Sequence, residues 1–257
     1  MSAYETVRYE KAGPVATITL NRPEARNGIT PQMMDDLWDA VQDAGADSAL
    51  RILVLRGAGR DFCPGADLKF YTAGAARPTR PETFGVSRVL HESPVVTVAA
   101  IRGACAGAGL GWASACDLRI CDETARFNVA FLDVGMSGDM AGTWFLPRIL
   151  GAAKARELYF LPGKFDAHEA ARIGLVNRVV PEADFETELA ALTERLAAAS
   201  PLAIKGMKAN FVDQERMGLP EFLAAETARH NACGRSEDSK EAFRAFVEKR
   251  KPVYQGR

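Results

Sequence analysis

Residues 103–111 read Gly-Ala-Cys-Ala-Gly-Ala-Gly-Leu-Gly, and residues 62–68 read Phe-Cys-Pro-Gly-Ala-Asp-Leu. Each stretch follows a short segment rich in β-branched residues, which is typical of a buried strand. Glycine and alanine leave main-chain N–H groups open to a ligand, and a helix starting near Gly109 would add its positive N-terminal end. The two stretches therefore predict two backbone amides directed at one oxygen atom, as in an oxyanion hole.

Strand-like and helix-like segments alternate over most of the chain. Strands are expected at Val15–Leu20, Ile52–Leu55, Val95–Ile101, Leu118–Cys121 and Val176–Val180. Helices are expected from a Thr30 cap through Ala44, over Ala167–Ile173 behind an Asp166 cap, and, after Pro181, at 185–196, from Pro201, at Pro220–Ala232 and at Ser236–Arg250. The pattern predicts an α/β domain over residues 1–198 and a C-terminal helical region over residues 199–257.

Composition narrows the classes of partner. A net charge of −1 over 257 residues offers no basic surface for nucleic acid or for an anionic membrane. No apolar run approaches the ~18 residues of a membrane span, and the first residues lack a secretory signal, so we expect a cytoplasmic protein. Five cysteines and three histidines show no metal-ligand spacing, so we expect no metal site and a buried, unreactive thiol at Cys63. Gly107, Gly109 and Gly111 partly match the G-x-G-x-x-G motif of dinucleotide-binding sites, but Trp112 stands where that motif needs its last glycine. The sequence therefore does not predict a dinucleotide-binding site.

Four segments in order resemble the crotonase family, also called the enoyl-CoA hydratase/isomerase family. They are residues 18–27 (Ile-Thr-Leu-Asn-Arg-Pro-Glu-Ala-Arg-Asn), the two glycine-rich stretches, residues 170–177 (Ala-Ala-Arg-Ile-Gly-Leu-Val-Asn) and the end of the chain at residues 245–252. The resemblance implies an enzyme of acyl-CoA thioesters, with coenzyme A as part of the substrate and no separate cofactor. It also implies a spiral of ββα turns, with C-terminal helices that cover the site and pack subunits into a homotrimer or a hexamer.

The resemblance also assigns roles to individual residues. The oxyanion donors would be the N–H groups of Ala66 and Ala108. Coenzyme A would contact Ala25, Arg26, the main chain of Pro64, Gly65, Asp67 and Leu68, and Lys249, the last possibly across a subunit boundary. From the residues alone, the glycines serve equally well for tight turns, and Lys249 for a solvated helix C-terminus. Phe243, Phe246 and Val247 read as a packing stripe rather than an acyl pocket.

The catalytic carboxylates of the family's hydratases are absent. The resemblance places those two glutamates at Gly111 and Phe131 of this chain. Hydration divides water activation and proton delivery between two carboxylates, whereas a double-bond shift needs one group that removes and returns a proton. Asp139, in Gly-Asp-Met-Ala-Gly-Thr-Trp, matches a catalytic aspartate of dienoyl-CoA and epoxyphenylacetyl-CoA isomerases.

Three readings therefore stay open. The first is an isomerase with Asp139 as acid/base, its pKa raised by apolar neighbours. The second is a hydratase with atypical residues, and the third is a non-catalytic acyl-CoA-binding protein. From the residues alone, Asp139 serves equally well to cap a helix beginning at Met140. Residues 72–83, rich in Ala, Gly, Pro and Arg, are expected to form a mobile loop over the acyl chain.

Overall fold

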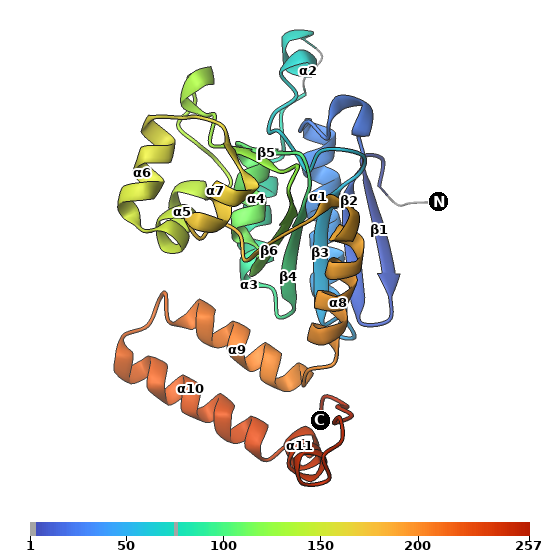
Figure 1. Ribbon diagram of the computed structural model, residues 1–257. Coiled ribbons are helices and arrows are strands. Elements are labelled where there is room, and N and C mark those ends of the chain that lie inside the picture. The colour runs from blue at the N-terminus through green and yellow to red at the C-terminus, as the bar shows by residue number, and fades with distance from the viewer. Residues whose placement is uncertain (1–3, 75–76) are drawn as a thin grey trace.

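The computed structural model describes residues 4–74 and 77–257, and a six-stranded sheet lies at its centre (Figure 1). Its strands, in spatial order, are β1 (Val7–Ala12), β2 (Val15–Leu20), β3 (Ile52–Gly57), β4 (Val96–Ile101), β6 (Leu118–Asp122) and β9 (Arg178–Val180). The β1–β2 hairpin is antiparallel, and every later neighbour pairs in parallel. Because spatial order follows chain order, the chain advances steadily across the sheet.

A second, smaller sheet stands beside the ends of the main strands. It contains β5 (Ala104–Ala106), β7 (Arg126–Asn128) and β8 (Phe165–Asp166). Strand β5 follows β4 after only two residues, Arg102 and Gly103, so the chain turns directly from one sheet into the other. This turn carries the second glycine-rich stretch out of the core and toward the site described below.

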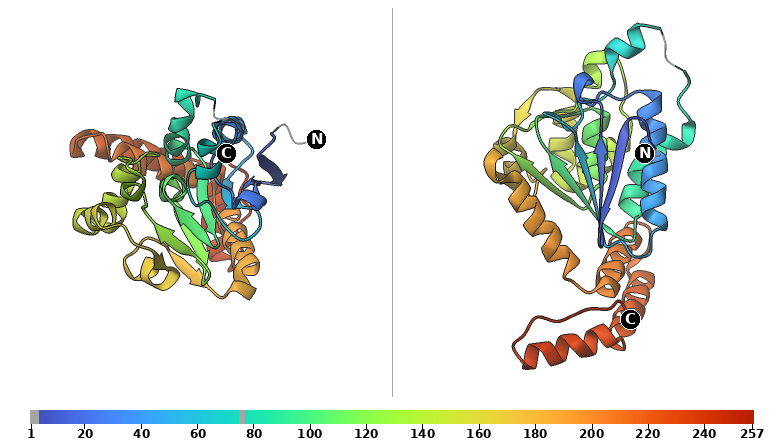
Figure 2. Two further views of the ribbon diagram at one scale, coloured as in Figure 1. Left: turned by 90° about the horizontal axis from the view of Figure 1, so that it is seen from above. Right: turned by 90° about the vertical axis from the view of Figure 1, so that its right-hand side faces the viewer.

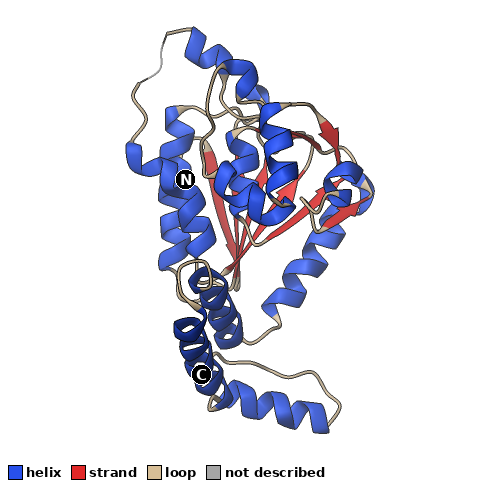
Figure 3. Ribbon diagram, turned by 90° about the vertical axis from the view of Figure 1, so that its left-hand side faces the viewer, coloured by secondary structure: helices blue, strands red, loops and turns tan. Residues whose placement is uncertain are grey.

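Helices cover both faces of the main sheet (Figure 3). The α-helices of the described residues are α1 (Pro31–Ala46), α2 (Leu68–Thr72), α3 (Val86–Glu92), α4 (Ala108–Ala115), α5 (Gly142–Leu150), α6 (Ala152–Phe160), α7 (Ala167–Arg172), α8 (Phe185–Ala197), α9 (Pro201–Asp213), α10 (Leu219–Gly234) and α11 (Glu237–Val247). One face packs with α1, α3, α4 and α5 in the larger core. On the other face Ile52, Val54 and Val98 pack against Phe185 and Leu189 of α8. Burial on both faces explains why the parallel strands read as continuous apolar runs.

The helices and strands confirm the α/β class and most of the expected elements. Thr30 caps α1 by accepting from the N–H of Met33, and Asp166 caps α7 by accepting from that of Glu169. Strand β1 was not expected, because it is an edge strand whose charged side chains are exposed. The last expected strand begins at Arg178 rather than Val176. Within residues 4–74 and 77–257, no helix is long and apolar enough to cross a membrane.

Helices α9, α10 and α11 extend away from the α/β body (Figures 1 and 2). Lys208, on α9, is a buried polar link to the body, and Glu215 and Arg216, just after α9, pair with His91 and Glu92 of α3. The Nζ of Lys208 contacts both carboxylate oxygens of Asp117 at 2.7 and 2.8 Å and donates to the carbonyl of His91 at 2.9 Å. Asp117 also accepts from the N–H and hydroxyl of Thr97, on β4. The division into domains at residue 198 stays a prediction.

We expect Lys208→Met to lower the free energy of unfolding by about 2 to 3 kcal/mol, because Asp117 would lose its cation in a largely buried place. Urea denaturation measures the change. Lys240→Met is the matched control, since Lys240 forms an exposed pair with Glu237 and should cost less than about 0.5 kcal/mol. Equal stability of the two variants would contradict the anchoring role of Lys208.

Candidate functional site

The two glycine-rich stretches lie in direct contact. Cys63 donates its N–H to the carbonyl of Ala104 and accepts from the N–H of Ala106, each at 2.9 Å, so the stretches pair like short parallel strands. Beyond this bridge both chains turn, at Gly65 (φ 96°) and Gly107 (φ 52°). A Cβ atom on Gly65 would lie 3.3 Å from the carbonyl oxygen of Ala106. Glycine is therefore required both for the backbone angles and for the close approach.

The N–H groups of Ala66 and Ala108 remain unbonded within the described residues. Ile29 bonds the carbonyl of Gly65 and the N–H of Asp67, so the N–H of Ala66, between them, faces away from Ile29. Ala108 is the first residue of α4, where an N–H has no acceptor in its own helix. The Cβ position of Gly65 lies 3.8 Å from the Ala108 nitrogen, which brings the two alanines to neighbouring places.

Both alanines line one pocket of about 500 Å³, a size usual for small-molecule sites. Among the described residues, its lining is Ile29, Met34, Pro64, Gly65, Ala66, Leu68, Tyr71, Thr79, Phe84, Gly107, Ala108, Ala130, Phe131, Val134, Met136, Asp139 and Met140. Asp139 is the one carboxylate of this described part of the lining. The pocket thus combines two free amides, one carboxylate and a largely apolar wall.

The Asp139 carboxylate is largely withdrawn from water. Its Oδ1 is buried and accepts no hydrogen bond within the described residues. Burial raises the pKa of this carboxyl to about 6. The alternative that Asp139 caps a helix from Met140 is wrong, because α5 begins at Gly142 and the residue at its N-cap, Ala141, makes no side-chain cap. The carboxylate is therefore free to exchange protons near neutral pH.

The place of the missing glutamate at Gly111 is filled by Met140. A Cβ atom on Gly111 would lie 2.6 Å from the Cβ of Met140, so no larger residue fits there. Met140 and Ala141 have φ values of 47° and 54°, a left-handed conformation that costs free energy in residues other than glycine. Packing of Met140 against α4 thus holds a strained turn, and that turn carries Asp139 into the pocket.

Tyr159, on α6, lies against the other side of this turn, and no local sequence pattern predicted that it would. Its ring stacks on Phe131, with parallel planes and centroids 6.3 Å apart. A Cβ atom on Gly142 would lie 2.3 Å from its hydroxyl oxygen, and one on Gly138 would lie 3.9 Å away. Burial, followed by the charge of Asp139, raises the pKa of Tyr159 to about 12, so the hydroxyl stays neutral beside that carboxylate.

Of the expected coenzyme A contacts, Pro64, Gly65 and Leu68 line the pocket, whereas Ala25, Arg26 and Asp67 lie outside its lining. Asp67 is already engaged, since it caps α2 and pairs with Arg22 at 3.0 Å. The Arg26 guanidinium pairs with Asp61 at 2.7 Å, although its side chain is 61% exposed. Their roles toward coenzyme A stay predictions.

Lys249 lies just after α11 in the sequence. Helix α11 is at the opposite end of the molecule from α2, which contributes Leu68 and Tyr71 to the pocket (Figure 1). A contact between Lys249 and a ligand in this pocket would therefore require a second subunit. The expected packing stripe is wrong for the single chain, because Phe243, Phe246 and Val247 are 69, 84 and 79% exposed. Only Asp238 and Ala245 of α11 are buried.

Cys63 is a buried thiol, as expected. Its side chain is fully enclosed, and desolvation raises its pKa to about 12. A thiol that stays protonated at neutral pH is a poor nucleophile. Cys63 also lies outside the pocket lining, so the structure offers it no nucleophilic role there.

Comparison with known proteins shows which family and which fold this chain shares. The model of the enoyl-CoA hydratase/isomerase family matches residues 10–257. A probable enoyl-CoA hydratase of Rhodobacter capsulatus is 37% identical over 99% of this chain and all of its own length. The (E)-benzylidenesuccinyl-CoA hydratase of Thauera aromatica is 32% identical over 97% of this chain and 99% of its own. A crystal structure of enoyl-CoA hydratase from Bacillus anthracis superposes with a TM-score of 0.91 at 28% identity, covering 98% of this chain and all of the other. The crotonase-like fold is thereby confirmed.

Gly111→Ala should displace Met140, lower stability by about 1 to 3 kcal/mol and reduce any activity that depends on Asp139, because the added Cβ meets a packed side chain. Urea denaturation and a turnover assay measure both effects. Gly45→Ala is the control: it lies in α1 with open space around it, and should raise stability by about 0.5 to 1 kcal/mol. Comparable stability of the two variants would contradict the tight contact.

Asp139→Asn should make the protein more stable at neutral pH. Burial raises the pKa of Asp139 in the folded protein above its ordinary value of 3.8, so its contribution to stability is fully present below pH 3.8 and is lost as the pH rises through about 6. Allowing for partial exposure, we expect the asparagine variant to gain about 1 kcal/mol between pH 4 and pH 7 relative to wild type. Denaturation across this range measures the gain. A difference that does not change with pH would contradict the raised pKa.

Proposed function

Because the chain belongs to the enoyl-CoA hydratase/isomerase family, we propose that its pocket is an active site for enoyl-CoA isomerisation. An acyl-CoA thioester would lie with its carbonyl oxygen between the N–H groups of Ala66 and Ala108. Asp139 would be the acid/base. The observation that carries this proposal is the Asp139 carboxylate, whose Oδ1 is buried without a partner among the described residues, in the same pocket as the two free amides.

The proposed reaction moves one proton along three carbon atoms. Ionised Asp139 removes a proton from the carbon next to the thioester, and the electron pair moves onto the carbonyl oxygen as a dienolate forms. The two amides stabilise the negative charge as it develops, each contributing about 3 to 4 kcal/mol in comparable enzymes. Protonated Asp139 then returns the proton two carbons further along, which re-forms the carbonyl and shifts the double bond. A carboxyl with a pKa near 6 suits both halves of this cycle.

The residues around Asp139 favour isomerisation over hydration. Hydration needs one group to activate water and another to deliver a proton. By resemblance, the two glutamates that do this in the family's hydratases are replaced by Gly111 and Phe131 in this chain. Met140 fills the space at Gly111, and Phe131 presents an aromatic ring stacked on Tyr159. Asp139 is the one carboxylate of the described lining, so a mechanism with a single acid/base fits the pocket best.

Hydration is the second candidate, and the relatives' names favour it. The similar proteins of Rhodobacter capsulatus and Thauera aromatica are both described as hydratases. In this reading Asp139 would act on water with help from a group such as Tyr159. Non-catalytic binding of acyl-CoA remains the third candidate, in which Asp139 exchanges no protons.

We also infer that the enzyme works as a homotrimer or a hexamer. The support is the exposed apolar surface of Phe243, Phe246 and Val247 on α11, together with Met207 and Phe211 on α9. Exposed apolar patches of this kind mark interaction surfaces. Such packing would also carry Lys249 toward a neighbouring subunit's pocket, where it could meet a coenzyme A phosphate.

Exchange of the α-hydrogens of butyryl-CoA in deuterated water tests the proposal without knowledge of the natural substrate. We expect wild type to exchange them, with a rate that rises with pH through about 6 and then levels, since the carboxylate form is the base. Asp139→Asn should slow exchange by about 10² to 10⁴ fold. Mass spectrometry of the recovered thioester measures the rate.

Asp133→Asn serves as the control, because Asp133 is exposed in the short turn Leu132–Val134 and does not line the pocket. Its exchange rate should equal that of wild type. Full exchange in Asp139→Asn would remove Asp139 from the mechanism. Efficient hydration of crotonyl-CoA that survives Asp139→Asn would favour the hydratase reading instead.

A further inference from the structure

Residues 77–85 form one wall of the pocket and are partly exposed to solvent. Thr79 and Phe84 line the pocket from residues 77–85, and Tyr71, at the end of α2, lies within reach of Thr79. Phe84 is 49% exposed, and the segment continues as a short 3-10 helix over Pro81–Gly85. The space left for an acyl group therefore depends on where this segment lies.

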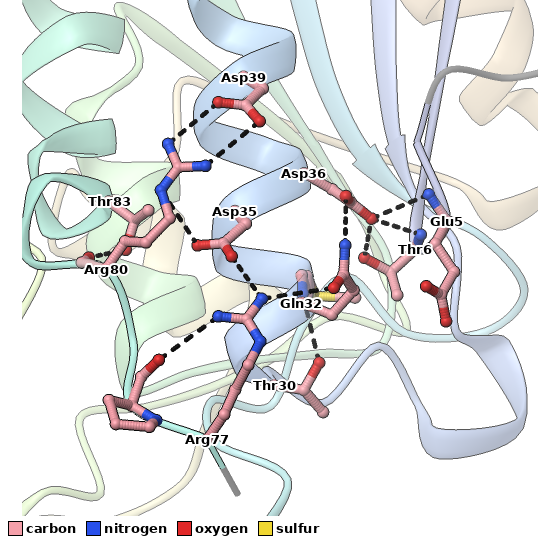
Figure 4. A network of polar contacts seen from close by, with 12 residues as sticks. Glu5, Thr6, Thr30, Gln32, Asp35, Asp36, Asp39, Arg77, Arg80 and Thr83 are labelled. Atoms are coloured by element: carbon pink, nitrogen blue, oxygen red, sulfur yellow. Dashed lines mark hydrogen bonds and ion pairs between the residues drawn. The ribbon is translucent and has the colours of Figure 1, made fainter.

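Two arginines fasten the segment to α1, as Figure 4 shows. Arg77 pairs with Asp35, and its guanidinium also donates to the side-chain oxygen of Gln32 at 3.3 Å. Arg80 contacts Asp39 at 3.2 Å and Asp35 at 3.6 Å. These ion pairs are here called the arginine latch; Arg80 additionally pairs with Glu82, in its own segment, at 3.1 Å.

The latch is the main polar attachment of residues 77–82. Their main chain makes one turn, from the N–H of Thr83 to the carbonyl of Arg80, and no main-chain hydrogen bond to the sheet or to α1 within the described residues. Beyond that turn the chain is fixed, because Thr83 is fully buried and a Cβ on Gly85 would lie 3.0 Å from the Trp38 ring. Release of the latch would therefore free residues 77–82 while Thr83 and Gly85 stay in place.

Asp36, between Asp35 and Asp39 in the sequence, pairs with neither arginine of the latch. Its carboxylate accepts from the N–H groups of Glu5 and Thr6, and from the Gln32 amide, whose oxygen accepts in turn from Arg77 (Figure 4). Met34, next to Asp35, lines the pocket. One helix thus supplies the inner pocket wall from Met34 and the attachment of the outer wall from Asp35 and Asp39.

We propose that the arginine latch limits the size of the acyl group that this site accepts, an inference that rests on the site binding acyl-CoA. While Arg77 and Arg80 stay paired, Thr79 is held against the pocket beside Phe84, which favours short acyl groups. A longer acyl group displaces the segment and must loosen the pairs. Partly exposed ion pairs are screened by salt, so acceptance of long acyl groups rises with ionic strength.

The test compares binding of butyryl-CoA and decanoyl-CoA by calorimetry to the full-length wild type and to Arg77→Gln/Arg80→Gln. The double variant should shift the ratio of affinities toward decanoyl-CoA by about three- to tenfold, since two screened pairs are lost. High salt should shift the wild-type ratio the same way and leave the variant nearly unchanged. Asp39→Asn, at an exposed position, should give a smaller shift in the same direction.

Arg88→Gln is the matched control, because Arg88 forms an exposed pair with Glu92 on α3 and does not line the pocket. Its ratio of affinities should equal that of wild type. An unchanged ratio in the double variant would overturn the latch, even if α-hydrogen exchange occurs. A shifted ratio without exchange by wild type would instead uphold the latch and overturn the proposed isomerase. Failure of wild type to bind either thioester would overturn both.

Discussion

The contact between the turns at Gly65 and Gly107 is the constraint on which the site depends. The bridge between Cys63 and Cys105 fixes the two stretches side by side, and glycine at both turns lets them touch. Two main-chain N–H groups then lack acceptors within the described residues, at Ala66 and at the start of α4. Amides held by strand pairing do not need to reorganise when negative charge develops nearby, which is why such sites stabilise oxyanions strongly.

The position of Asp139 follows from packing on both sides of its turn. Met140 fills the space above Gly111, and Tyr159 lies against Gly138 and Gly142. Between these contacts the backbone adopts left-handed angles, and Oδ1 of the carboxylate is buried without a partner among the described residues. The turn is thus unfavourable in its own right and persists because the surrounding core fixes it, a pattern common at functional sites. Stability and reactivity are opposed at this residue.

The sequence predicted what depends on local pattern. Strands such as Val15–Leu20, the caps at Thr30 and Asp166, and the glycine turns all have signatures within a few residues, and the apolar neighbours of Asp139 predicted its raised pKa. It could not predict contacts between distant segments, such as Met140 with Gly111 or Tyr159 with Gly142. The pairing of Arg77 with Asp35 likewise depends on where a loop crosses a helix. Whether Lys249 reaches a pocket depends on how subunits pack together, which the sequence of one chain does not predict.

The most direct measurement is a crystal structure of the protein with an unreactive acyl-CoA thioester bound. The account predicts that the thioester carbonyl oxygen lies about 2.7 to 3.1 Å from the nitrogens of both Ala66 and Ala108, with the Asp139 carboxylate beside the neighbouring carbon. A carbonyl oxygen bonded elsewhere, with either amide left facing solvent, would contradict it.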